Sequence, residues 1–232
     1  MSHVIFRSSY IQHAAAIIEH AHKVGACVLL DSFQAVGTFP VDVQQLKPDF
    51  LTGGVLKWLC GGPGTAFLYV RPDLATKLEP KLTGWVANQN PLGFEIGPQR
   101  YTSGAYRFMN GTPSVPALYC ARPGLKIIRE VGIAAIREKS KRQTARLSAL
   151  ADERGWRVNT PRDPEHRGGT VSIDMPDSEA VCRELLARNI LVDYRPKAGV
   201  RMSPHFYNSD EELQVAVSAI DEIIAVRGVA AR

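Results

Sequence analysis

Residues 26–72 read ACVLLDSFQAVGTFPVDVQQLKPDFLTGGVLKWLCGGPGTAFLYVRP, and short apolar runs in this stretch alternate with polar or glycine-rich turns. The run at 26–31 predicts a buried strand of a parallel sheet, with Asp31 at its carboxyl end. Residues 41–54 predict a short helix followed by a strand, and residues 64–72 predict another strand that a proline closes. Alternation of helix and strand indicates an α/β sheet.

Residues 2–25 precede this stretch and predict one more strand and a helix, whereas residues 73–112 follow it and predict loops. Residues 2–9 predict a further strand, and the alanine-rich residues 11–25 predict a helix that stops at Gly25. Residues 73–112 are rich in Gly, Pro and Asn, which is typical of functional loops or of segments that contact another subunit. We therefore expect residues 1–112 to form a partial large domain with an incomplete, mostly parallel sheet.

The second half predicts a small α+β domain over residues 113–232. Its first part is helical with a break near 130–132, and strands and helices then alternate up to a final helix that Asn208 or Ser209 can cap. The basic cluster at 137–146 lies in the helical part, and it predicts a solvated helix face.

Composition and charge exclude several classes of protein. The chain has 232 residues, 45% hydrophobic and 22% charged, and no apolar run reaches the roughly 20 residues of a membrane span. The first residues do not follow the order of a signal peptide, so we expect a cytoplasmic protein. The net charge of +5 is spread thinly and no nucleic-acid reader motif occurs, which argues against nucleic acid as a partner. The four cysteines are widely spaced, which indicates buried free thiols and neither a disulfide framework nor a metal site.

Three polar residues follow predicted strands in the first half. Asp31, Gln34 and Lys57 would converge on one pocket, because ligands of open α/β sheets collect at the carboxyl ends of strands. A lysine in apolar, glycine-rich surroundings loses its proton more easily and can attack an aldehyde. Pyridoxal phosphate needs such a lysine and a carboxylate beside its ring nitrogen. From spacing alone, Asp31 also fits a turn or a helix cap, and Lys57 also fits a lysine whose stem lies along apolar surface.

Residues 29–74, which contain these three side chains, resemble the core of the class V aminotransferase and kynureninase-like family. Members are pyridoxal-phosphate enzymes of fold type I. Residues 2–12 (SHVIFRSSYIQ), 108–119 (FMNGTPSVPALY) and 199–213 (GVRMSPHFYNSDEEL) resemble further segments of the family, so the resemblance covers nearly the whole chain. Members carry a long segment before this point, with the phosphate loop and the ring that stacks on the cofactor. The resemblance therefore implies that the chain is the C-terminal part of a longer enzyme.

The resemblance assigns roles to individual residues. Lys57 matches the lysine that forms the Schiff base with pyridoxal 5'-phosphate. Asp31 matches the partner of the pyridine nitrogen, and Gln34 matches the residue beside the 3-oxygen of the cofactor. Three positions match residues that reach the cofactor phosphate, usually from the neighbouring subunit of a homodimer, and they are Trp85, Asn110 and Thr112.

The resemblance also indicates an amino-acid substrate. Arg201 matches the arginine that binds the α-carboxylate, for which a planar guanidinium is well suited. Kynureninases carry a histidine and a tyrosine where this chain has Gln34 and Leu56, which favours a broader aminotransferase or lyase and leaves kynurenine-type C–C hydrolysis as the alternative. Cysteine desulfurases need a nucleophilic cysteine shortly before the substrate arginine. Residues 191–199 contain no cysteine, and Cys182 lies in a predicted helix. Both observations argue against cysteine desulfurase activity.

Two readings of the function follow. The first is a pyridoxal-phosphate enzyme acting on an amino acid, which as this chain alone would bind the cofactor weakly and have little activity. A visible absorbance band on adding the cofactor would contradict the weak binding. The second is a non-catalytic remnant that dimerises through residues 73–112 with a longer homologue. A nucleotide-binding module is disfavoured, because no glycine-rich phosphate loop follows a strand.

Overall fold

The structure, a computed structural model, describes residues 1–228. The chain divides into two compact units that are interleaved along the sequence. Unit 1 comprises Met1, His13–Phe33 and Val41–Ile127. Unit 2 comprises Ser2–Gln12, Gln34–Pro40 and the chain from Ile128 onward. The change between the units after Ile127 falls inside a helix, and the division into domains 1–112 and 113–232 stays a prediction.

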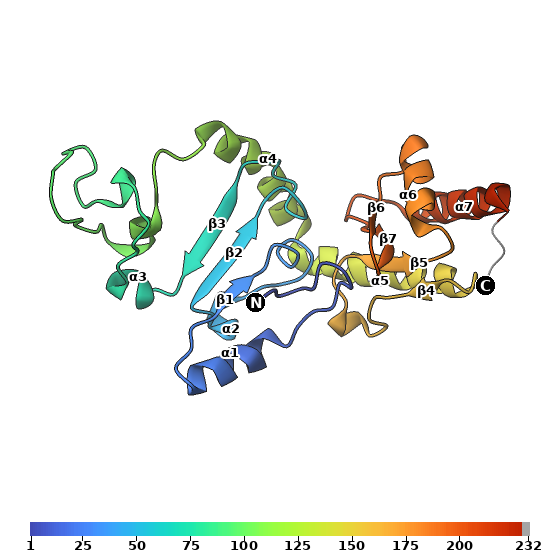
Figure 1. Ribbon diagram of the computed structural model, residues 1–232, viewed down its shortest axis with the longest axis horizontal. Coiled ribbons are helices and arrows are strands. Elements are labelled where there is room, and N and C mark those ends of the chain that lie inside the picture. The colour runs from blue at the N-terminus through green and yellow to red at the C-terminus, as the bar shows by residue number, and fades with distance from the viewer. Residues whose placement is uncertain (229–232) are drawn as a thin grey trace. The chain divides into compact units, whose positions relative to one another are not determined.

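Unit 1 is built on a three-stranded sheet with helices beside it (Figure 1). Its strands are β1 (Leu29–Asp31), β2 (Phe50–Gly54) and β3 (Ala66–Val70). Its helical elements are α1 (Ala14–Lys23), α2 (Val43–Leu46), α3 (Leu74–Lys77), η1 (Trp85–Ala87), η2 (Gly104–Phe108) and the greater part of α4 (Val115–Val131). β1 and β2 are parallel, whereas β2 and β3 are antiparallel, so this sheet is mixed where the sequence predicted a mostly parallel one. The predicted α/β class is confirmed.

The core of unit 1 lies on one face of β1. Leu30 is fully buried and packs with Ala14 and Ile18 of α1, whereas Leu29 is 46% exposed. The predicted buried strand over 26–31 is therefore wrong in length and in burial, since β1 has three residues and only its middle side chain is covered. A strand buried on both faces needs a cover on each, and Leu29 lies on the face that has none among the described residues.

The predicted strand over residues 2–9 is also wrong. Val4 and Ile11 form one isolated antiparallel bridge, and Ser9 adopts a left-handed conformation (φ 62°) that turns the chain. The segment forms hydrogen bonds within itself, such as Ile5 N to the Tyr10 carbonyl (2.8 Å), and with residues 168–170 of the same unit, where Gly168 N donates to the Ser9 carbonyl (2.7 Å) and Thr170 N donates to Ser9 Oγ (3.1 Å). Backbone groups satisfied in this way do not need a sheet neighbour.

Unit 2 is the predicted small α+β fold. Its helical elements are α5 (Ile133–Asp152), η3 (Pro164–His166), α6 (Ser178–Ala187) and α7 (Asp210–Arg227). Its strands are β4 (Arg157–Val158), β5 (Val171–Asp174), β6 (Asp193–Arg195) and β7 (Gly199–Met202), in the order β4-β5-β7-β6 with every pair antiparallel. The core of unit 2 packs the three helices against this sheet around fully buried residues such as Leu185, Val200 and Ile220.

Two predicted helix boundaries are confirmed. The break between α4 and α5 falls at Gly132, whose φ of 85° suits glycine. α7 is capped by Ser209, whose hydroxyl accepts from Glu212 N (3.2 Å) while the Glu212 carboxylate accepts from Ser209 N (2.7 Å). This reciprocal pair is a capping box, so Asn208, the other candidate, is not the cap.

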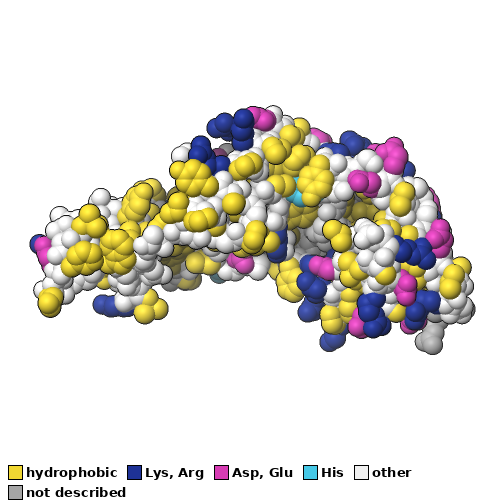
Figure 2. Space-filling view, turned by 90° about the horizontal axis from the view of Figure 1, so that it is seen from above, with side chains coloured by type: hydrophobic (Ala, Val, Ile, Leu, Met, Phe, Trp, Pro, Cys, Tyr) yellow, Lys and Arg dark blue, Asp and Glu magenta, His cyan; other side chains and the backbone are white. Residues whose placement is uncertain are grey.

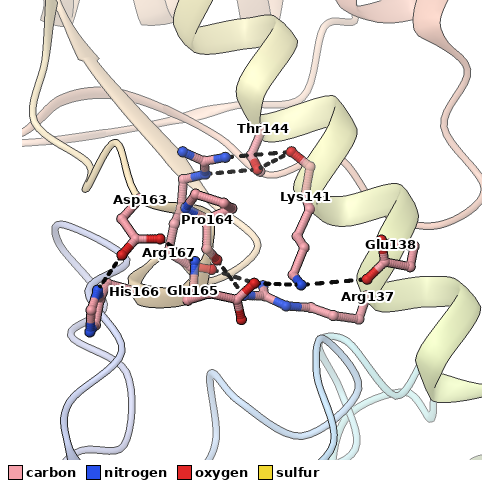
Figure 3. Close-up of polar contacts among 9 residues, drawn as sticks. All are labelled: Arg137, Glu138, Lys141, Thr144, Asp163, Pro164, Glu165, His166 and Arg167. Atoms are coloured by element: carbon pink, nitrogen blue, oxygen red, sulfur yellow. Dashed lines mark hydrogen bonds and ion pairs between the residues drawn. The ribbon is translucent and has the colours of Figure 1, made fainter.

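The basic cluster of α5 is not a uniformly solvated face. Arg137 is only 7% exposed and donates to the backbone carbonyls of Arg167 (2.8 Å) and Pro164 (2.5 Å) (Figure 3). Its guanidinium lies 5.6 Å from the centroid of the Phe39 ring. Burial lowers the pKa of Arg137 from its usual value. The sequence predicted that the whole basic cluster is exposed. A run of basic residues does not reveal which arginine faces the inside of the fold, and here it is Arg137.

The cysteines only partly follow the expectation of buried thiols. Cys182 is buried in α6 and Cys60 is half-buried, but Cys27 and Cys120 are exposed. None of the helices within residues 1–228 combines the length and the apolarity that a bilayer crossing requires.

Candidate active site

The ends of β1 and β2 place two of the predicted site residues at the same edge of the sheet. The strands run parallel with Asp31 opposite Thr52, so their carboxyl ends lie side by side. Asp31 is the last residue of β1, and Lys57 follows closely on Gly54, the last residue of β2. Neighbouring strands are about 4.8 Å apart, which brings the start of the Lys57 loop next to Asp31.

Phe33 contacts both residues. Its backbone N–H donates to Asp31 Oδ1 at 3.0 Å, and the centroid of its ring lies 5.0 Å from Lys57 Nζ. A Cβ on Gly54 would lie 2.2 Å from the Phe33 ring, so glycine at that position lets the ring lie against the end of β2. The carboxylate of Asp31 and the amine of Lys57 are therefore linked through one residue, since the first contacts the backbone of Phe33 and the second contacts its ring.

Tight local packing fixes the loop that carries Lys57. Cys60 N donates to the Lys57 carbonyl (3.0 Å), and Gly61 N donates to the Val55 carbonyl (2.7 Å). A Cβ on Gly61 would lie 2.6 Å from the Val55 side chain, and one on Gly124 of α4 would lie 2.1 Å from the Cys60 carbonyl oxygen. Glycines at both positions allow the loop to close on itself and α4 to lie against it.

The environment of Lys57 differs from the enclosed setting that the sequence predicted. The side chains of Leu56 and Lys57 are exposed, and only Trp58 of this trio is buried. The ammonium is instead placed over the Phe33 ring, where a cation–π attraction favours it. Lys57 lies in the hairpin loop between β2 and β3, and it is exposed.

Trp85 and Asn110 lie close together in unit 1. Val86 N donates to the Asn110 carbonyl (3.3 Å), and a Cβ on Gly111 would lie 3.6 Å from Trp85 Nε1. Thr112 follows two residues later and is exposed, as Trp85 and Asn110 are.

The segment that carries Trp85 leaves the sheet at the end away from Lys57. Figure 1 shows α3 at the carboxyl end of β3, and the chain continues from there into η1 and η2. Because β2 and β3 are antiparallel, the carboxyl end of β3 is the opposite end of the sheet from the Lys57 loop. Trp85 and the η1 and η2 elements thus follow the end of the sheet away from Lys57, and the role of Trp85, Asn110 and Thr112 at the phosphate of a neighbouring subunit stays a prediction.

Gln34 and Arg201 belong to unit 2. Gln34 is half-buried at the start of a turn, and its carbonyl accepts from Thr38 Oγ1 at 3.5 Å. Arg201 lies on β7 and pairs with Asp193 of β6, to whose carboxylate its Nε donates at 2.6 Å. Asp193 and Phe33 are contacts that sequence reasoning missed. Asp193 and Arg201 are opposite charges close together in the sequence, but only the strand register shows that they face each other.

The residues at the edge of β1 and β2 fit pyridoxal phosphate. One oxygen of Asp31 accepts from the backbone, and its second oxygen has no hydrogen bond within residues 1–228, so it can accept from a protonated ring nitrogen. Lys57 presents a primary amine, the group with which an aldehyde cofactor forms a covalent bond. Both groups that the cofactor needs are thus present, each in contact with Phe33.

A pocket of about 380 Å³ in unit 2 contains none of the predicted site residues. α5 contributes Arg137, Glu138 and Lys141 to its wall, and η3 contributes Glu165. Lys141 Nζ lies 2.7 Å from Glu165 and 3.4 Å from Glu138, so these charged residues of the pocket wall form ion pairs with one another (Figure 3). The hydrogen bond and charge of Glu165 raise the pKa of Lys141.

Comparison with known proteins identifies relatives over almost the whole chain. Residues 7–215 match the model of the aminotransferase class-V family. The chain is 34% identical over 223 residues to the uncharacterized aminotransferase YcbU of Bacillus subtilis (strain 168), covering 96% of this chain and 58% of YcbU. It is 29% identical over 232 residues to a kynureninase of Pseudomonas fluorescens, covering 97% of this chain and 55% of the kynureninase.

A solved structure shows the same fold. The apo structure of a cysteine desulfurase from Thermococcus onnurineus NA1 superposes with a TM-score of 0.87 at 25% identity, over 98% of this chain and 59% of the desulfurase. The chain thus spans somewhat over half the length of the relatives it matches. The predicted family and fold type are confirmed, and this chain belongs to the class V aminotransferase family, whose cofactor is pyridoxal phosphate.

Proposed function

We propose that the protein acts on an amino acid with pyridoxal phosphate bound covalently through Lys57 and paired with Asp31. One observation carries this proposal, namely that the Asp31 carboxylate and the Lys57 amine both contact Phe33 at the shared carboxyl edge of β1 and β2. A cofactor whose ring nitrogen and aldehyde lie on opposite sides of one ring needs a carboxylate and an amine at such an edge.

Each residue has a distinct task in this proposal. When bound, the cofactor withdraws electrons from the α-carbon of the amino acid. Asp31 keeps the ring nitrogen protonated, because a carboxylate favours the charged form of a neighbouring base. Lys57 Nζ accepts the α-proton and returns it as a general base and acid. Arg201 orients the substrate by its carboxylate.

The covalent role of Lys57 can be tested by reduction. We expect the purified chain to gain the mass of the cofactor after incubation with pyridoxal phosphate and borohydride, with Lys57 as the modified residue in a peptide map. Lys57→Ala should lose this adduct, whereas Lys81→Ala, which removes another exposed lysine of unit 1, should keep it. An adduct of equal yield in Lys57→Ala would refute the assignment.

The type of reaction is the finer part of the proposal. We propose transamination or lyase chemistry, which the 34% identity to an aminotransferase supports. Kynureninase-type C–C hydrolysis is the alternative. Gln34 and Leu56 argue against it, because kynureninases resemble this chain but carry other residues at those positions. Formation of a keto acid from a supplied amino acid would distinguish transamination from cleavage of the side chain.

Exposed apolar side chains favour a second candidate function, a chain that pairs with another copy or with a longer homologue. Leu82, Phe94 and Ile96 of unit 1 are 89%, 75% and 105% exposed. In Figure 2 apolar side chains gather on the end of unit 1 at the left. Contiguous apolar surface of this kind marks interaction sites. Sedimentation equilibrium should show a dimer that Phe94→Ser weakens, and a monomer at every concentration would exclude self-association.

A further inference from the structure

Arg201 is held on three sides within unit 2. Its Nε and Nη2 donate to the two carboxylate oxygens of Asp193 at 2.6 and 2.5 Å. Its Nη1 donates to the carbonyl of Phe6, and the ring centroid of Phe6 lies 5.7 Å from the guanidinium carbon. The Arg201 side chain is only 11% exposed, so these contacts fix its orientation.

The backbone itself brings Asp193 and Arg201 together. β6 and β7 are antiparallel, and their register places Asp193 directly opposite Arg201. Directly opposite residues of an antiparallel pair have Cβ atoms about 5 Å apart, which suits a pair of opposite charges. Arg195 Nη2 lies 3.5 Å from the same carboxylate and offsets part of its negative charge.

The pair with Asp193 leaves part of the guanidinium available. Arginine has five N–H donors, and the contacts to Asp193 and Phe6 use three of them within the described residues. Nε is used, and each terminal nitrogen keeps one further N–H. Two such donors are the number that a bidentate carboxylate accepts from an arginine.

We propose that Asp193 is the positioning residue for Arg201, holding it by the Nε and Nη2 edge so that the remaining N–H groups bind the carboxylate of the amino-acid substrate. This inference rests on the proposed function, in which Arg201 binds that carboxylate. If Asp193 instead competed with the substrate for Arg201, its removal would strengthen carboxylate binding. The two possibilities therefore differ in the sign of the effect.

The experiment follows the Arg201 Nε–H signal by NMR in the full chain, with the signal assigned by its absence in Arg201→Lys. L-alanine is titrated as the probe, and L-alaninamide, which lacks the carboxylate, is titrated in parallel. We expect Asp193→Asn to broaden or lose the ordered Nε–H signal and to weaken L-alanine binding roughly tenfold, with L-alaninamide unaffected. Asp193→Glu, which keeps the charge, should restore part of both.

Asp221→Asn is the matched control, because Asp221 also pairs through both oxygens with an arginine, Arg154 Nε at 2.9 and 2.8 Å, in the same unit. It should leave the Arg201 signal and L-alanine binding unchanged. An ordered Arg201 signal in Asp193→Asn, or L-alanine binding that is equal or tighter, overturns the proposal, as does a wild-type chain that binds L-alanine no better than L-alaninamide. Failure of the proposed function shows separately, as absence of the Lys57 adduct.

Discussion

Asp49 shows how a single buried charge is stabilised in unit 1. Its side chain is 2% exposed and accepts from Val28 N (2.6 Å), His22 Nε2 (2.9 Å) and Arg71 Nη1 (2.8 Å). Burial alone would raise its pKa, but the hydrogen bonds from Val28 and His22 and the charge of Arg71 outweigh burial and hold the pKa below its usual value. A carboxylate held in this way stabilises the fold only while it is ionised.

We predict that Asp49→Asn lowers the free energy of unfolding at pH 7 by about 3 kcal/mol, because it removes one partner of a buried pair. The folded pKa lies below the unfolded pKa of about 3.9, so the contribution of Asp49 is present above that pH and is lost as the pH falls through the folded pKa. Urea unfolding should therefore show that the difference in unfolding free energy between wild type and Asp49→Asn becomes smaller below about pH 4.

Asp73→Asn is the control for this measurement, since Asp73 also binds Arg71 but is 47% exposed. Its removal should change stability little. If the difference in unfolding free energy between wild type and Asp49→Asn stays constant from pH 7 to pH 3, the lowered pKa of Asp49 does not contribute to stability.

At the scale of elements, the placement of α4 against the Lys57 loop depends on a residue without a side chain. A Cβ on Gly124 would lie 2.1 Å from the carbonyl oxygen of Cys60 and 2.7 Å from that of Leu59. These are backbone atoms, which cannot turn away as a flexible side chain can. The close approach of α4 therefore helps to define where the loop after Lys57 runs.

We predict that Gly124→Ala destabilises unit 1 by about 1–3 kcal/mol, even though alanine favours a helix by about 1 kcal/mol, because overpacking against backbone must move α4 or the loop. Retention of the cofactor on Lys57 should fall in parallel. Thermal unfolding and the yield of the borohydride adduct measure the two effects.

Gly111→Ala is the matched control, since an added Cβ there would meet only Trp85 Nε1 at 3.6 Å. Its stability should stay within about 0.5 kcal/mol of wild type. Equal stability of the two alanine variants would mean that α4 and the loop adjust without cost.

At the scale of the whole molecule, unit 2 is assembled from segments far apart in the sequence. Besides the chain from Ile128 onward it includes residues 2–12 and 34–40. The N-terminal segment supplies the Arg7 carbonyl that accepts from Ser172 Oγ (2.6 Å) and the Ser9 hydroxyl that accepts from Thr170 N. A cut at residue 128 therefore does not release a complete folding unit.

We predict that a fragment of residues 128–232 unfolds at a lower urea concentration than unit 2 does in the full chain, because Thr170 N and Ser172 Oγ lose their hydrogen-bond partners. Fusing residues 2–12 to that fragment through a glycine–serine linker should recover part of the loss. The midpoints from circular dichroism measure this, and equal midpoints for the fragment and the full chain would contradict the assignment of residues 2–12 to unit 2.

Much of the secondary structure could be predicted from the sequence, because it depends on neighbours along the chain. The break at Gly132 follows from one glycine between two periodic segments, and the cap of α7 follows from Ser209 and Glu212 three residues apart. The family followed from motifs spread along the chain, of which residues 29–74 are the longest. The roles of Lys57, Asp31 and the other site residues stay predictions.

Only the tertiary structure decided which of these residues meet. It brought Phe33 into contact with both Asp31 and Lys57, set Asp193 opposite Arg201, buried Arg137 within a basic run, and gave residues 2–12 to unit 2. The physical reason is that helix and strand signals arise from contacts a few residues apart. Burial, strand register and hydrogen-bond partners are instead set by residues that can be more than a hundred positions away.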